Sequence, residues 1–123
     1  MGLSDTDILD RKFQKDLTTG IAALVLLGVL SRATEPMYGY QIAKLIEESR
    51  GEVLTIKQGT LYPVLRMLQS YSLLESEVEP SVSGPPRRYY RITKSGRTTL
   101  ERWRRIWNQT KALVDTVSEG GGE

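Results

Sequence analysis

A change of periodicity in the second half of the chain constrains the fold more than any other feature. Residues 74–79 alternate between small or apolar side chains and glutamates, and residues 87–92 show the same two-residue alternation. The residues between them, 80–86, are all Pro, Ser, Val or Gly, so the pattern predicts a β-hairpin with a projecting loop. One strand carries carboxylates and the other arginines, and we therefore expect cross-strand ion pairs. By the same alternation Tyr90 should face inward and Tyr89 outward.

The segment from about Gln58 to Tyr71 has an apolar face and a polar face at helical spacing. Pro63 lies in its first turn, where the missing N–H costs little. The apolar face consists of Leu61, Val64, Leu65 and Leu68, and the polar face of Gln58, Tyr62, Arg66 and Gln69. Spacing alone fits an ordinary amphipathic helix, whereas the hydrogen-bonding ends of the polar side chains also suit a recognition surface.

Three helices are expected before this segment. The first begins at Ser4, whose hydroxyl can accept a hydrogen bond from the N–H three residues on. The second runs from about Thr18 to Ser31, and the third follows Pro36 and is stopped by Gly51. The third helix is expected to place Tyr38, Ile42, Leu45 and Ile46 on one face. Residues 52–56 are rich in β-branched side chains and favour a small strand.

The last helix is expected to begin near Thr93, a suitable N-cap residue, and it carries a heptad pattern. Its spacings alternate between four and three residues, which is the period of a coiled-coil seam. The seam consists of Gly96, Leu100, Trp103, Trp107, Thr110, Val114 and Val117, widened by Ile106 and Leu113. A single small domain has difficulty burying so long a stripe, and we therefore expect helix-mediated dimerisation. The alternative is that the helix folds back on its own domain.

The order of three helices, a β-hairpin and a long helix is that of a winged helix-turn-helix protein with added terminal helices. The expected fold is mainly α with a small β-hairpin. It divides into an N-terminal helix (1–16), a winged helix-turn-helix domain (17–93), a dimerisation helix (94–118) and a disordered tail (119–123). In this fold the helix before the hairpin enters the major groove of DNA, and the hairpin, or wing, lies at the backbone or in the minor groove.

Charge and composition narrow the function classes. The net charge is only +2, but residues 87–105 hold eight basic residues and one acidic residue, a local charge of +7 that attracts anionic partners. The chain has no Cys and no His, which excludes thiol or imidazole catalysis and thiolate or imidazole metal sites. With no glycine-rich phosphate loop and no nucleophile beside a base, we expect a protein that is not an enzyme and needs no cofactor or metal.

The N-terminus gives an expectation about location. It is acidic, unlike a signal peptide, and the longest apolar run, Ile21–Leu30, is shorter than a membrane span. We therefore expect a cytoplasmic protein with no membrane partner, in which this run lies in a buried core helix.

Three motifs resemble the PadR family of bacterial and archaeal transcriptional regulators, and in particular its small subfamily with a single C-terminal helix. They are residues 36–42 (PMYGYQI), 59–68 (GTLYPVLRML) and 84–93 (GPPRRYYRIT), followed by Gly96. The motifs occur in the family's order and spacing, and the similarity covers roughly residues 17–107. The resemblance implies a homodimer that binds double-stranded DNA at a palindromic operator, usually as a repressor released by a small effector.

The polar helix face and the resemblance together give the expected DNA contacts. They are Tyr38, Tyr40, Lys57, Gln58, Thr60, Tyr62, Arg66, Gln69, Arg87, Arg88 and Tyr89. Arg and Gln suit bidentate contacts to guanine and adenine, and the wing arginines suit phosphates or a narrow minor groove. The chain departs from the family at Ser72, which stands where a glycine in a left-handed conformation is usual. Gln69 and Ser70 also replace acidic residues common in the family, which removes repulsion from DNA.

The resemblance also implies an effector site and a dimer interface. Some members of the family bind flat aromatic compounds between the subunits, and here the effector-binding candidates are Trp103, Trp107, Phe13 and Leu17. Alternatively, both tryptophans are structural dimer core. The expected dimer interface consists of Leu100, Trp103, Ile106, Trp107, Thr110, Leu113, Val114, Val117, Ile8 and Phe13.

A second function class stays open, that of a protein–protein adaptor whose winged helix has lost its DNA role. The outer face of the helix at 58–71 discriminates between the two classes. A winged helix that no longer reads DNA should carry acidic or apolar residues there, whereas this one carries Gln58, Tyr62, Arg66 and Gln69.

Overall fold

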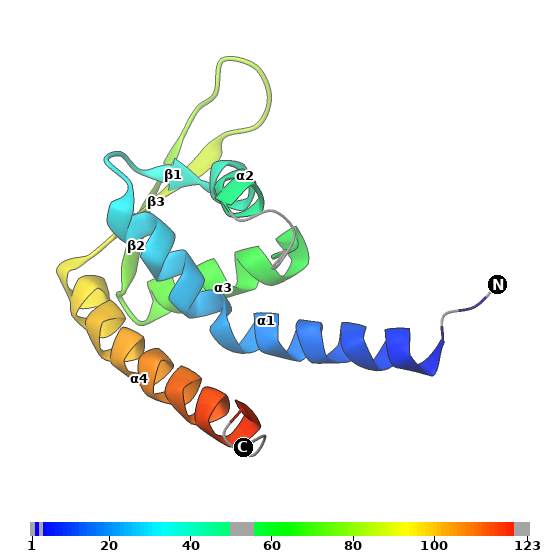
Figure 1. Cartoon of the computed structure of the whole chain (residues 1–123). Coiled ribbons are helices and arrows are strands. Elements are labelled where there is room, and N and C mark those ends of the chain that lie inside the picture. The colour runs from blue at the N-terminus through cyan, green and yellow to red at the C-terminus, as the bar shows by residue number, and fades with distance from the viewer. Residues whose placement is uncertain (1, 3, 50–55, 120–123) are drawn as a thin grey trace.

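The computed structural model describes residues 2, 4–49 and 56–119, and it has the expected mainly α-helical fold with a small antiparallel sheet (Figure 1). The elements are α1 (Asp5–Arg32), β1 (Met37–Tyr38), α2 (Gly39–Ser49), α3 (Gln58–Ser70), β2 (Leu74–Glu79), β3 (Arg87–Ile92) and α4 (Lys94–Glu119). Helices α2 and α3 form the helix-turn-helix pair, and β2 and β3 form the wing. Residues 52–55 of the expected small strand and residues 120–123 of the expected tail lie outside the described residues.

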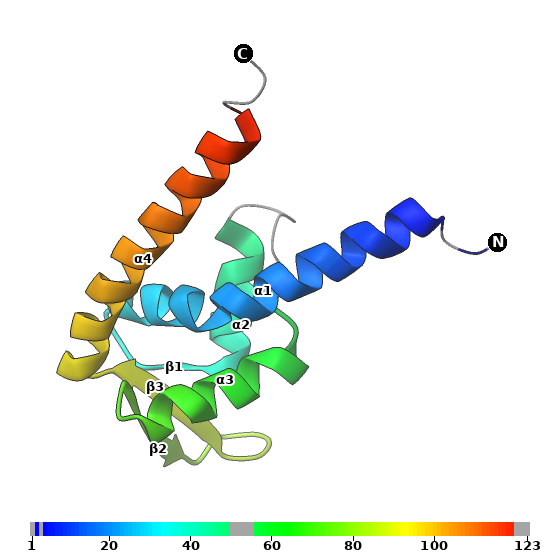
Figure 2. The same ribbon diagram turned by 90° about the horizontal axis from the view of Figure 1, so that it is seen from below.

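The expectation of two helices before Pro36 is wrong, because α1 runs unbroken from Asp5 to Arg32. Nothing at residues 16–18 breaks a helix, and the glycine at position 20 is tolerated within one. The expected cap is confirmed, since the Asp7 N–H donates to Ser4 Oγ at 3.1 Å. The first half of α1 extends away from the domain in both views (Figures 1 and 2).

Within the described part of the chain, α1 is also the one helix long and apolar enough to cross a membrane by length and composition. The expectation that its apolar run is too short for a span therefore does not hold for the helix as a whole. Core helices of soluble proteins meet the same criteria, and four residues of α1, namely Ala22, Leu26, Leu27 and Leu30, are buried in the core of this domain.

The sheet has the strand order β1-β3-β2, and all its pairs are antiparallel. The hairpin pairs six residues on each side, from Leu74 opposite Ile92 to Glu79 opposite Arg87. Strand β1, which the sequence did not predict, adds two residues to the other edge of β3. A two-residue strand is too short to show an alternation pattern. The expected facing is confirmed, since Tyr90 is 4% exposed and Tyr89 is only half-buried.

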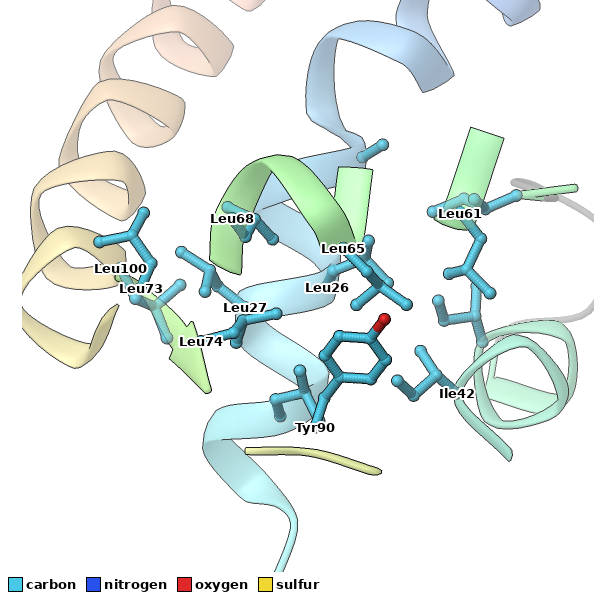
Figure 3. Close-up of a cluster of buried hydrophobic side chains, with 14 residues drawn as sticks. Leu26, Leu27, Ile42, Leu61, Leu65, Leu68, Leu73, Leu74, Tyr90 and Leu100 are labelled. Carbon is cyan, nitrogen blue, oxygen red and sulfur yellow. The ribbon is translucent and has the colours of Figure 1, made fainter. Parts of the chain in front are cut away.

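A single core joins all these elements (Figure 3). The inner face of α3 supplies Leu61, Leu65 and Leu68, which are fully buried. In Figure 3 the ring of Tyr90 lies among core leucines and Ile42 of α2. Each fully buried side chain of this kind stabilises the fold by about 1.5–3 kcal/mol. Two of the residues expected on one face of α2 differ. Tyr38 lies in β1, before α2 begins, and Leu45 is 43% exposed because it faces a surface groove instead of the core.

The turn between α3 and β2 is held against the start of α4. Ser72 has a φ of 63°, so the left-handed conformation expected at this position is present even though the residue is serine. Thr93 is the expected N-cap of α4: its hydroxyl accepts from the Gly96 N–H at 2.9 Å and donates to the Ser72 carbonyl at 2.7 Å. Position 96 must be glycine, because a Cβ there would overlap the Leu73 carbonyl oxygen.

We expect Gly96→Ala to lower the free energy of unfolding by about 3 kcal/mol, because the added methyl group meets backbone that cannot move away. The matched control is Gly20→Ala in α1, where nothing lies within 4 Å of the added group. This control should raise stability by about 0.5–1 kcal/mol. Equilibrium urea unfolding at fixed protein concentration measures both, and equal effects would contradict the close approach at Gly96.

We expect Ser72→Gly to stabilise the protein by about 0.5–1 kcal/mol, because glycine adopts the left-handed backbone without the steric strain of a Cβ. Ser70→Gly, in the last turn of α3, should instead destabilise it, because glycine has the lower helix propensity. Thermal unfolding of both variants shows whether each substitution raises or lowers the stability relative to the wild type. A loss of stability in Ser72→Gly would show that the turn carries no strain.

Candidate nucleic-acid interface

A groove of about 720 Å³ lies between α3 and the wing, and we call it the α3–wing groove. It is lined by Tyr38, Gly39, Tyr62, Arg66, Gln69, Ser70, Pro86, Arg87, Arg88 and Tyr90. Six of the side chains expected to contact DNA therefore converge from three separate segments of the chain. The other expected contacts, Tyr40, Lys57, Gln58, Thr60 and Tyr89, lie outside this lining.

The orientation of α3 follows from its buried face. Because Leu61, Leu65 and Leu68 point into the core, Gln58 and Arg66 are left exposed. The N-cap residue of α3, Lys57, is exposed and makes no side-chain capping bond. The positive end of the helix dipole and a lysine therefore coincide at the start of α3, which favours an anion there. Thr60, in the same turn, is half-buried.

Tyr62 packs against α2 as well as lining the α3–wing groove. Its side chain is half-buried, and its hydroxyl lies only 2.6 Å from where a Cβ of Gly39 would be. A larger residue at position 39 would collide with the ring, so this glycine allows α2 and α3 to approach closely. The ring thereby helps to fix the angle between these helices while its edge lines the α3–wing groove.

Aromatic rings hold one wing arginine at the edge of the groove. The guanidinium of Arg87 lies over the Tyr38 ring, 4.4 Å from its centroid. Tyr38 in turn contacts Tyr89 edge-on at 5.4 Å and is stacked on Tyr40 at 6.5 Å between centroids. Lys44 lies 5.9 Å from the Tyr40 ring centroid. Such cation–π contacts contribute about 0.5–1 kcal/mol at exposed sites, so Arg87 is pre-positioned without losing its charge.

A short hydrogen-bond chain joins the wing to the end of α3. Arg88 Nη1 donates to Ser76 Oγ at 2.9 Å, and Ser76 Oγ donates to Gln69 Oε1 at 2.9 Å. Gln69 is half-buried. Neither Ser76 nor this chain was expected from the sequence, because the three residues lie on three elements and no periodic pattern connects them.

The arginines of the groove have no acidic partner among the described residues, where the ion pairs are Lys12–Asp16, Arg91–Glu75 and Lys111–Asp115. The expected cross-strand pair is thus confirmed for Arg91, at 2.7 Å from Glu75, but it does not neutralise Arg87 or Arg88. Burial raises the pKa of Tyr90 above its ordinary value of 10.0, while the nearby Arg88 and Arg66 oppose that shift. The groove therefore presents the positive charge of three arginines beside the buried hydroxyl of Tyr90.

A second groove, of about 710 Å³, lies between the second half of α1, α2 and α4, and we call it the α1–α4 groove. Of the expected effector residues, only Trp107 lines it. Trp103 packs against the domain's own core, and Phe13 and Leu17 are exposed on α1. The described residues include no group of three or more His, Cys, Asp or Glu that could hold a metal ion.

The expected dimer residues fall into two groups. Leu100 is only 8% exposed and, like Trp103, packs within its own domain. For the first turns of α4, the alternative that the helix folds back on its own domain is therefore the correct one. The others are exposed: Ile8, Phe13, Ile106, Trp107, Thr110, Leu113, Val114 and Val117. Beyond these first turns α4 extends away from the domain (Figures 1 and 2).

Comparison with known proteins gives consistent matches. The model of the transcriptional regulator PadR-like family matches residues 26–102, which include α3 and the wing. A PadR family transcriptional regulator from Eggerthella lenta is 32% identical with a TM-score of 0.77, over 93% of this chain and 96% of that chain. A transcriptional regulator from Clostridium thermocellum is 27% identical with a TM-score of 0.77, over 85% and 99%. An uncharacterised protein from Lysinibacillus sphaericus is 32% identical over 83 residues, 68% of this chain and 76% of that protein.

We expect the stability of the protein to fall as the pH rises above about 10, because Tyr90 ionises more readily in the unfolded chain than in the folded one. Tyr90→Phe should lose less stability over this range. The control is Tyr71→Phe, at a position that is 71% exposed. Urea unfolding across the alkaline range measures the difference, and an equal alkaline loss in both variants would show that Tyr90 is not shielded.

Proposed function

The chain belongs to the PadR-like family of transcriptional regulators, and on that premise we propose that it is a homodimeric repressor acting at a palindromic operator. Family membership makes it a DNA-binding transcriptional regulator with a winged-helix fold, and not an enzyme. The observation that carries the proposal is the α3–wing groove, where three arginines that have no acidic partner in the described part of the chain lie at the exposed face of α3 and on the wing. We further propose that the protein acts in the cytoplasm, where the DNA is.

The proposed contacts follow from where each side chain lies. Arg66 and Gln58, exposed on the outer face of α3, read base edges in the major groove. Lys57 and Thr60, at the start of the same helix, contact a phosphate. Arg87 and Arg88, with Tyr38, Tyr40 and Tyr89 around them, bind the backbone or enter the minor groove. Tyr62 and Gln69, which also line the α3–wing groove, complete the set of proposed DNA contacts.

Exposed apolar side chains support the proposed homodimer. On α4 these residues are between 37% and 68% exposed, from Trp107 to Val117, and they continue the heptad seam. The first half of α1 adds Ile8 and Phe13, at 54% and 66%. Monomeric proteins rarely expose contiguous apolar surface on this scale. Pairing two copies through these helices would present two α3 helices to two half-sites of one operator.

We also propose that a small aromatic effector releases the protein from DNA. Trp107 offers a stacking surface in the α1–α4 groove, and Arg104 lines the same groove. The other three candidate residues do not line this groove, and a site between two copies could add them from the second chain. The effector therefore stays a prediction from the family.

We expect Arg66→Ala and Arg87→Ala to impair DNA binding in different ways. If Arg66 reads a base, its loss should cost about 1–3 kcal/mol and relax specificity at one position. The loss of Arg87 should weaken binding to all sequences alike and reduce the slope of log affinity against log salt by about one. Fluorescence anisotropy with specific and scrambled duplexes, over a series of salt concentrations, separates the two effects.

Arg91→Ala is the matched control for these variants, because Arg91 is already paired with Glu75 and should change affinity little. Binding that is unaffected by all three substitutions would remove the α3–wing groove from the DNA interface. If the wild-type protein binds no duplex of its own upstream region selectively at any salt concentration, the adaptor hypothesis gains support instead.

We expect Leu113→Glu to dissociate the dimer without unfolding the domain, because this side chain is 61% exposed within one chain but would be buried between two. DNA affinity should fall with dimerisation, since one half-site alone offers fewer contacts. Light scattering coupled to size exclusion gives the mass, and the control is Gln109→Glu, which adds the same charge at an exposed polar position. A variant that stays dimeric would place the interface elsewhere.

A further inference from the structure

We propose that Ser76 is a positioning residue that determines specificity. It holds the side-chain amide of Gln69 so that the NH2 group of this amide, and not its oxygen, faces the DNA. The inference rests on the DNA interface proposed above. Ser76 does not itself line the α3–wing groove, whereas both of its hydrogen-bond partners, Gln69 and Arg88, do. Ser76, a residue of β2, would thus determine which hydrogen-bonding groups of Gln69 and Arg88 face the DNA.

The direction of the hydrogen bonds follows from the chemistry of the donors. A guanidinium can only donate, so the contact of 2.9 Å between Arg88 Nη1 and Ser76 makes the serine oxygen the acceptor. The single hydroxyl proton of Ser76 is then free for its other neighbour, Gln69, at 2.9 Å. The structure places the amide oxygen Oε1 of Gln69 at this position, and this oxygen accepts the proton. The amide nitrogen Nε2, with its two protons, is left for the groove.

This arrangement changes what Gln69 can recognise. A freely rotating glutamine reads adenine with two bonds, accepting from N6 and donating to N7. With Oε1 held by Ser76, the exposed end of Gln69 is a donor. It suits guanine, with its neighbouring acceptors N7 and O6, thymine O4 or a phosphate oxygen. Adenine fits less well, because its N7 acceptor lies beside the N6 donor. The same serine holds the Arg88 guanidinium, so the donors at the end of α3 and on the wing keep a fixed spacing.

The local structure favours a hydroxyl at position 76. Ser76 lies in β2 directly opposite Tyr90 of β3, and its half-buried side chain reaches α3 across the turn at Ser72. Its neighbours Glu75 and Glu77 are exposed. An alanine at this position would keep the strand pairing but leave Gln69 and Arg88 free to rotate.

The experiment selects binding sites from a duplex pool randomised over two helical turns, with the wild type, Ser76→Ala, Ser76→Thr and Gln69→Ala. For the wild type we expect guanine or thymine at the position next to Gln69. In Ser76→Ala adenine should become acceptable there, and the affinity for the wild-type consensus should fall about five-fold, as for the loss of one hydrogen bond. Ser76→Thr keeps the hydroxyl and suits a strand, so it should retain the wild-type preference.

Two controls separate positioning from a general loss of structure. In the Gln69→Ala background the Ser76→Ala substitution should cause no further change at that base position. Ser118→Ala removes a hydroxyl that, among the described residues, donates to the Val114 carbonyl of the same helix, and it should behave as wild type. If Ser76→Ala does not fold, the wild-type consensus makes the test, since adenine at the position next to Gln69 would show that Oε1 is not held by Ser76. Gln69→Glu tests only whether the NH2 group makes the contact, because its carboxylate can accept from Ser76 but has no proton to donate. Its preference for guanine or thymine should be lost.

The outcomes distinguish this inference from the proposed function. A wild-type protein that selects no consensus overturns both. A wild type that selects a consensus, together with a Ser76→Ala variant of unchanged base preference, overturns only the role of Ser76. An equal effect of Ser76→Ala with and without Gln69 also overturns it, because the serine would then act on the fold and not on the glutamine.

Discussion

The burial of the inner face of α3 is the interaction on which the rest of the structure depends. Leu61, Leu65 and Leu68 have no exposed surface, and they pack with leucines of α1 and with Tyr90 of the wing in one core. The helix cannot rotate without taking these side chains out of the core, and each carries about 1.5–3 kcal/mol of burial energy. The outer face that carries Arg66 is therefore fixed by the hydrophobic face behind it.

Specific contacts at the rim of this core fix α2, α3 and the wing relative to one another and so define the shape of the α3–wing groove. The Tyr62 ring against Gly39 sets how closely α2 approaches α3, and the contacts of Tyr38 with Arg87 and of Ser76 with Arg88 fix the wing. Each rim contact is worth little beside the core. Their effect is on geometry, because they hold the cationic side chains of the groove in defined positions.

The basic segment at residues 87–105 is divided among several roles once it is folded. Arg87 and Arg88 line the α3–wing groove, whereas Arg91 is paired with Glu75. Arg97 donates to the Ser31 carbonyl at 3.2 Å, at the C-terminal end of α1, where a cation is favourable. The local charge of +7 therefore overstates the charge available to DNA, although it correctly locates the wing.

The sequence by itself determined what depends on neighbouring residues along the chain. The alternation of side chains predicted the hairpin and the inward orientation of Tyr90. Helical spacing predicted the two faces of α3, and the side-chain chemistry of Ser4 and Thr93 predicted that they cap helices. Only the tertiary structure decided that α1 is continuous, that Leu100 packs within its own domain, and that Gln69, Ser76 and Arg88 form one chain. The physical reason is that periodicity records which side of an element is buried. Which residues meet across elements depends on the packing angles of helices and strands, and no local pattern encodes those angles.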